Sequence, residues 1–208
     1  MQNNLKLLKK AFNSNPVAKA IEIVVFIGEL AVAIFAVLTK DYIVAVCSGM
    51  TAFCALVFLL IALSHDMKVS KIIAQRIKSN EINAVCEDFF SDGNIDIGGK
   101  ASGGIGKLAT FGKYYIFIYG MSGTPCIFRY DEIIWAFDRV CGSWMMVFHG
   151  SEGVLGTLDQ ISRLKNGAEA INLCYQIIAE RNPLCMLGFN EENRSKCFEI
   201  QNKNKKKK

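Results

Sequence analysis

The sequence predicts an α+β membrane protein, in which a hairpin of two transmembrane helices precedes a cytoplasmic β-meander or barrel capped by a C-terminal helix. Three observations predict this class. Residues 17–64 are almost wholly apolar, charged residues gather after residue 65, and the apolar pattern changes from a helical to an alternating period near residue 94. The 208 residues are 51% hydrophobic and 21% charged, which suits one short membrane region and one domain of ordinary size.

Two apolar runs are each long enough to cross a bilayer. They are predicted to span about 17–39 and 42–64, within a hairpin at 16–65. The first run is long, and the second follows it at once, so a signal peptide is not expected.

Lysine and arginine flank the outer ends of both runs, whereas the turn between them offers only Lys40 beside Asp41. The positive-inside rule then predicts a multi-pass protein of the cell membrane with both termini in the cytoplasm. In the basic, amphipathic N-terminus (1–15), Leu5, Leu8 and Phe12 share one helical face. This segment is interpreted either as a short helix on an anionic inner leaflet or as a frayed basic terminus.

Glu29 stands in the middle of the first apolar run. It belongs to a stripe at helical spacing, made of Glu22, Phe26, Glu29, Ala33 and Ala36. If the hairpin turns at residues 40 and 41, this stripe faces Ser48, Thr51 and Ala55 on the second run. We therefore expect Glu29 to bond to Thr51 or to another copy of the hairpin, and Glu22 to pair with Lys19. The alternative is that Glu29 forms part of an ion or proton path, which would require an oligomer.

The remaining chain divides into three predicted parts. Residues 66–92 form a helical connector that breaks at Ser79-Asn80, residues 93–200 form an α+β domain, and residues 201–208 form a basic disordered tail. Seven short strands are expected in the domain because β-branched and aromatic runs alternate with turn residues. The strands are predicted at 95–98, 106–111, 114–119, 126–130, 133–140, 143–149 and 154–158.

A helix is expected to follow the strands, with Asn166 as its N-cap, Glu169 completing a capping box and Pro183 ending it. Seven antiparallel strands and then one helix is the order of a pleckstrin-homology-like (PH-like) barrel. "FRYDEIIWAFDRV" and "AERNPLCMLGFNEENR" are similar to segments of an uncharacterised bacterial family of two-span membrane proteins with a PH-like cytoplasmic domain. The resemblance covers about 65–200 and implies a membrane-anchored PH-like module. Another small α+β domain with a meandering sheet is the alternative fold.

The stretch "GGKASGGIGK" at 98–107 fails the phosphate-loop pattern, because Ala101 stands where the first glycine is required and Leu108 follows the lysine. The loop is nevertheless basic, through Lys100, Lys107 and the nearby Lys113. The PH-like resemblance implies that these lysines contact anionic lipid headgroups.

No pattern predicts a cofactor, a metal site or a set of catalytic residues. The eight cysteines lack the clustered spacing of a zinc site, so free and mostly buried thiols are expected. Trp135 and Trp144 are interpreted as core residues that face each other across a hairpin, and a peptide-binding groove is the alternative.

The sequence thus predicts a membrane-anchored binding or scaffolding module without catalysis of its own. Its expected partners are membrane lipids, an unidentified protein and further copies of its own hairpin, but not nucleic acid. Two alternatives stay open: an oligomeric transporter or channel component that uses Glu29, and an enzyme with an unrecognised site.

Overall fold

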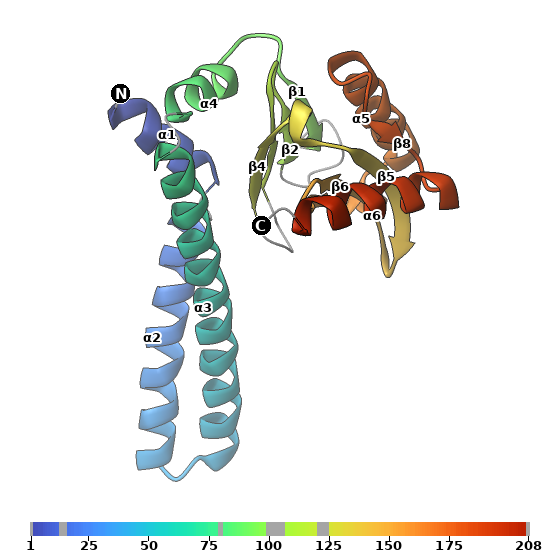
Figure 1. Ribbon diagram of the computed structural model, residues 1–208. Helices are drawn as coiled ribbons and strands as arrows, with labels where there is room; N and C mark the ends of the chain where they lie inside the picture. The colour runs from blue at the N-terminus through green and yellow to red at the C-terminus, as the bar shows by residue number, and fades with distance from the viewer. Residues whose placement is uncertain (1, 13–15, 79–80, 99–106, 120–124, 207–208) are drawn as a thin grey trace. The chain divides into compact units, whose positions relative to one another are not determined.

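The computed structural model describes residues 2–12, 16–78, 81–98, 107–119 and 125–206, and its α+β class confirms the prediction (Figure 1). The chain divides into two compact units, one of residues 9–71 and the other of residues 1–8 with 72–208. Lys100 and the glycine-rich stretch around it lie outside the described residues.

The hairpin unit contains most of α2 (Pro16–Leu38) and α3 (Tyr42–Lys78). A tight turn joins the helices, with Lys40 in the left-handed region at a φ of 62° and the Asp41 amide donating to the Ala36 carbonyl at 2.8 Å. Both predicted apolar runs are confirmed as helices. The second run and the first part of the connector form one unbroken helix, because no glycine or proline interrupts 50–78.

Stretches Lys19–Leu38 and Tyr42–Ile73 are long and apolar enough to cross a membrane, by length and composition. Most of their large apolar side chains point away from the other helix. Phe35, Phe53 and Phe58, for example, are each more than 60% exposed. Small residues occupy the contact between the helices, where Ala36, Ala52 and Ala55 are buried.

Helix α1 (Gln2–Phe12) confirms the predicted amphipathic N-terminus. On its apolar face, Leu8 is 0% exposed and Phe12 is 3% exposed. The helix contradicts the interpretation of this segment as a frayed terminus, whereas its contact with an anionic leaflet stays a prediction.

The second unit begins with α4 (Ile82–Phe89) and then forms two four-stranded sheets. The first sheet runs in chain order, with antiparallel strands β1 (Ile95–Gly98), β2 (Lys107–Phe111), β3 (Tyr115–Ile118) and β4 (Cys126–Arg129). The second sheet has the order β7-β6-β5-β8, with strands β5 (Trp135–Cys141), β6 (Ser143–Gly150), β7 (Gly153–Leu158) and β8 (Met186–Leu187). All seven predicted strands are confirmed to within two residues at each end.

One continuous core joins both sheets to helix α5 (Gly167–Arg181). On the strands, its members alternate with residues of the opposite face. The core includes Phe111, Ile116 and Phe128 of the first sheet, Met146, Phe148 and Leu158 of the second, and Ile171, Cys174 and Ile178 of α5. The sheets approach each other closely where β7 meets β4, because a Cβ on Gly156 would lie 2.9 Å from the Phe128 ring.

Three predictions for this unit are wrong. Residues 201–205 are not disordered, because α6 (Glu191–Lys205) continues through them and buries Gln201. Trp135 pairs with His149 and Trp144 pairs with Val140, so the two tryptophans do not face each other; the tight turn at Gly142 fixes this register. Asn166 is the N-cap residue of α5, as predicted, but the capping box is wrong, because the Asn166 side chain bonds to the Glu169 side chain at 2.8 Å and not to the helix backbone.

Candidate functional site

The stripe of α2 that contains Glu29 lies on the packed side of the hairpin, as predicted. Glu22, Phe26, Glu29 and Ala33 are half-buried and Ala36 is buried. On α3, Ser48 is 8% exposed and belongs to the facing stripe, which also agrees with the prediction. Among the described residues, the Glu29 side chain has no hydrogen-bond partner.

The predicted contact between Glu29 and Thr51 is wrong. Thr51 is exposed, and its hydroxyl donates to the Cys47 carbonyl of its own helix at 3.1 Å. Ala52 takes the expected place, with 4% exposure. Successive side chains on a helix point about 100° apart. A single-residue error in the predicted register of α3 therefore moves Thr51 out of the contact between the two helices.

A polar cluster lies at the open end of the hairpin, where the predicted pairing of Lys19 with Glu22 is wrong. The Lys19 ammonium pairs with Asp66 on α3 and not with Glu22. The Nδ1 atom of His65 lies 3.8 Å from a carboxylate oxygen of Asp66. One oxygen of Glu22 is buried and accepts no hydrogen bond from the part of the chain that is described. A cation and three titratable groups therefore share the base of the helix pair.

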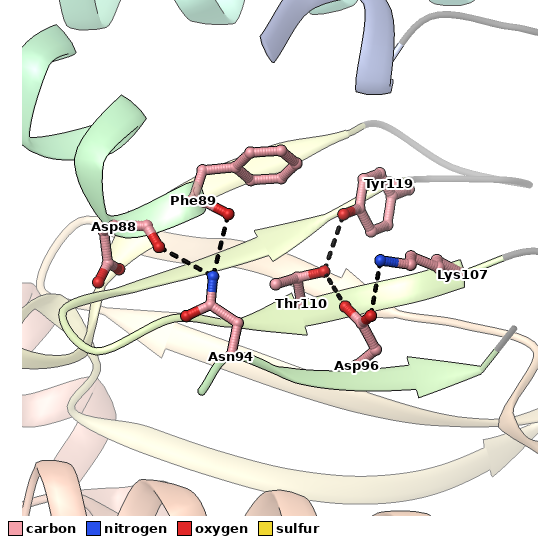
Figure 2. Close-up of polar contacts among 7 residues, drawn as sticks. All are labelled: Asp88, Phe89, Asn94, Asp96, Lys107, Thr110 and Tyr119. Carbon is pink, nitrogen blue, oxygen red and sulfur yellow. Dashed lines mark hydrogen bonds and ion pairs between the residues drawn. The ribbon is translucent and has the colours of Figure 1, made fainter. Parts of the chain in front are cut away.

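A second polar cluster lies on the first sheet, toward the ends of the strands that lead into the β1–β2 and β3–β4 connections (Figure 2). Lys107 pairs with Asp96 at 2.6 Å, and the Thr110 hydroxyl donates to the same carboxylate at 2.5 Å. The Tyr119 hydroxyl lies 2.8 Å from that of Thr110. Burial raises the pKa of Tyr119 to about 12, so this phenol stays neutral at physiological pH.

Lys113 lies at the other end of β2, in the turn to β3. The buried carboxylate of Asp88 on α4 holds this turn by accepting the backbone N–H groups of Lys113, Tyr114 and Tyr115 at 2.7, 3.0 and 2.8 Å. The Lys113 ammonium lies 5.0 Å from the centre of the Tyr114 ring. Figure 2 shows Asn94 beside Asp88, where its amide donates to the carbonyls of Asp88 and Phe89 and caps α4.

The two described lysines that were predicted to contact lipid, Lys107 and Lys113, therefore do not lie together. Strand β2 separates Lys107 from Lys113 by at least about 13 Å, at ~3.3 Å per residue. The Lys107 charge is also partly neutralised by Asp96, so an anionic group must compete with that carboxylate. Lys107 nevertheless keeps 55% of its side chain exposed.

Beside Asp96, a pocket of about 270 Å³ separates the end of β1 from the start of α5. Its lining includes Ile97, Leu164, Lys165 and Glu169.

The eight cysteines are free thiols, of which four are buried. Within the described ranges, no group of histidine, cysteine and acidic side chains has the arrangement of a metal site.

Comparison with protein-family models, with curated proteins and with solved structures found no match.

Proposed function

We propose that this protein is a membrane-anchored binding module, in which a two-span hairpin holds a PH-like domain at the cytoplasmic face of the cell membrane. The observation that carries the proposal is that the two units differ in how far their large apolar side chains are buried. The hairpin exposes most of its large apolar side chains, whereas the second unit has a continuous core of its own. A helix pair with this surface is stable in lipid, because hydrogen bonds within each helix already satisfy the backbone N–H and C=O groups.

The order of the strands supports the PH-like fold. Four antiparallel strands form one sheet, the next three form the other, and α5 then packs against the shared core. Strand β8 and helix α6 are additions to that order.

The membrane topology can be tested with a natural cysteine. Cys141 is exposed on the β5–β6 turn, whereas Cys47 and Cys54 both lie within the apolar part of α3. A water-soluble maleimide should label Cys141 in inside-out membrane vesicles and not in right-side-out vesicles. Cys141→Ser is the control for the site of labelling. Labelling from the outer side, or release of the chain by alkaline carbonate, would contradict the anchored topology.

The binding role predicts ligand contact without chemical turnover. The extent of chemical labelling of the domain's surface should differ between nanodiscs with anionic lipid and nanodiscs without it. Turnover of a metabolite that one substitution in the domain abolishes would instead identify an enzyme.

The alternative of an oligomeric transporter rests on Glu29, which lies on the packed side of the hairpin and not on its outer surface. Ion flux through reconstituted protein that Glu29→Gln abolishes would favour transport. Absence of flux in both forms, with unchanged self-association, would favour a packing role between helices or between copies.

A further inference from the structure

The first sheet has an open edge at β1, which pairs with β2 and with no other strand of the described chain. The N–H of Tyr119, which directly follows β3, donates to the Leu108 carbonyl at 3.0 Å. Backbone groups alternate in direction along an antiparallel strand, so Ala109, the next residue of β2, turns its own N–H and C=O toward β1. Ile97 lies opposite Ala109 and bonds to these groups, and Asp96 therefore directs its N–H and C=O away from the sheet.

A pocket of about 270 Å³ lies beside this edge, between the end of β1 and the start of α5. Ile97 and Leu164 are buried in its wall, and Ala170 and Leu173 of α5 line it as half-buried residues. Ile97 belongs to the main core, so the pocket opens on the core side of the sheet. Unpaired backbone groups and an apolar cavity thus adjoin along one groove.

Three of the described residues that line the pocket are charged, and two of them already have partners. Asp96 pairs with Lys107 (Figure 2), and Glu169 accepts a hydrogen bond from the Asn166 amide. Lys165 is exposed and has no ion pair within the part of the chain that is described. The cation left without a partner at this groove complements a carboxylate, and Glu169 is the lining group that opposes one.

We propose that this groove binds the carboxyl-terminal end of a partner protein as an added strand. The chain end pairs with the N–H and C=O of Asp96, its terminal carboxylate contacts Lys165, and its last side chain is apolar and enters the pocket. A chain end fits because β1 has four residues and alternate ones bond to β2, so few partner residues can pair. The residues on either side of the one opposite Asp96 direct their side chains to the face of Ile97, so apolar side chains are expected at alternate positions.

This inference rests on the proposed binding function and names the class of partner. Its probe is a fluorescently labelled peptide with the sequence Gly-Ser-Gly-Val-Thr-Leu and a free carboxylate, and the same peptide with a terminal amide is the control. With the full chain in nanodiscs, we expect the free acid to bind at least about tenfold more tightly than the amide, because it adds a charge-assisted contact. Nanodiscs without protein measure binding to lipid alone.

Two variants of opposite effect test the charge of the groove. Lys165→Gln should weaken binding of the free acid about tenfold and leave binding of the amide unchanged. Glu169→Gln removes the opposing carboxylate and should strengthen binding of the free acid. Arg163→Gln removes a charge two residues from Lys165 and outside the pocket lining, so it should change binding by less than about twofold. Equal effects of Lys165→Gln on both peptides would overturn the carboxylate contact.

Hydrogen exchange at single residues tests the added strand. The Asp96 amide should exchange more slowly when the free acid is bound, whereas the Ile97 amide, which already bonds to β2, should change little. Octanoate is the competitor, since it has a carboxylate and an apolar tail but no peptide backbone. Peptide binding that leaves the Asp96 amide unprotected, or octanoate binding as tight as that of the peptide, would assign the pocket to a small amphiphile and overturn the inference.

Failure of the free acid to bind both the native chain and Glu169→Gln would also overturn it. Cys141 labelling and lipid-dependent protection of the domain are independent of these results, so the proposed function would still stand.

Discussion

The carboxylate of Asp88 fills the space in which a side chain on Gly112 would begin. From this position it accepts three backbone N–H groups of the β2–β3 turn, so α4 and the first sheet are joined through one buried anion. The same turn carries the exposed Lys113 and Tyr114.

Asp88→Asn should destabilise the domain by about 3 kcal/mol, because an amide cannot accept at both positions and leaves buried donors unpaired. Gly112→Ala should also be strongly destabilising, since the added methyl displaces the carboxylate. Both tryptophans lie in the domain, so denaturation followed by their fluorescence reports this unit alone. Asp92→Asn, at an exposed position nearby, is the control. Equal unfolding midpoints for Asp88→Asn and Asp92→Asn would contradict the anchoring role.

Lys107 and Lys113 should respond differently to anionic lipid if the connection between β1 and β2 contacts headgroups. We expect phosphatidylserine in nanodiscs to protect Lys107, but not Lys113, from a water-soluble acylating reagent. Asp96→Asn releases the Lys107 charge and should increase that protection about fivefold, which corresponds to ~1 kcal/mol per lysine at an anionic surface. Equal protection of both lysines, or a loss of protection in Asp96→Asn, would contradict this assignment.

The strands were predictable because their signals are local. Alternating apolar residues and a glycine turn at Gly142 specify β5 and β6 without knowledge of their partners. Strand β8 has only two residues, and its pairing with β5 depends on contacts more than forty residues apart, so its pattern could not be recognised. Helix α6 lacks an apolar stripe. The available signal was Asn190 followed by Glu191 and Glu192, with lysines in the last turn, which suits a capped helix and its dipole.

Side-chain pairing in the hairpin was less predictable than the helices. The stripe on α2 follows from the helical period alone. The residues that face it depend on how the turn at Lys40 rotates α3 about its own axis. Lys19 can reach two acids, Glu22 on its own helix and Asp66 on α3. Only the packing of the two helices shows that Asp66, 47 residues away in sequence, is its partner.

Lys19→Met should destabilise the helix pair, because it leaves the half-buried Asp66 carboxylate without its cation. The exchanged variant Lys19→Asp with Asp66→Lys should recover much of that loss. Thermal aggregation in detergent, followed by size-exclusion chromatography, measures the effect. Lys68→Met, at an exposed position near the same end, is the control. Failure of the exchange to restore any stability would indicate that the surroundings, and not the ion pair, fix this end of the hairpin.

The stability of the domain should depend on pH through the carboxyl group of Asp138. Burial alone would raise the pKa of Asp138, but hydrogen bonds from Tyr175 and Trp144 outweigh it and lower that pKa below its ordinary value. A carboxyl whose pKa is lowered by folding stabilises the folded state above its unfolded pKa of about 3.9, and this contribution disappears as the pH falls through the folded pKa.

Tyr175→Phe removes one of these bonds, so its destabilising effect should be largest near neutral pH and should shrink below about pH 4. Denaturant titrations at several pH values, followed by tryptophan fluorescence, measure the difference. The Tyr175 hydroxyl also accepts the Asp138 backbone N–H at 2.9 Å, and the loss of that bond does not vary with pH. An effect that stays constant from neutral to acidic pH would assign the whole contribution of Tyr175 to the backbone bond and to packing, and none to the carboxylate.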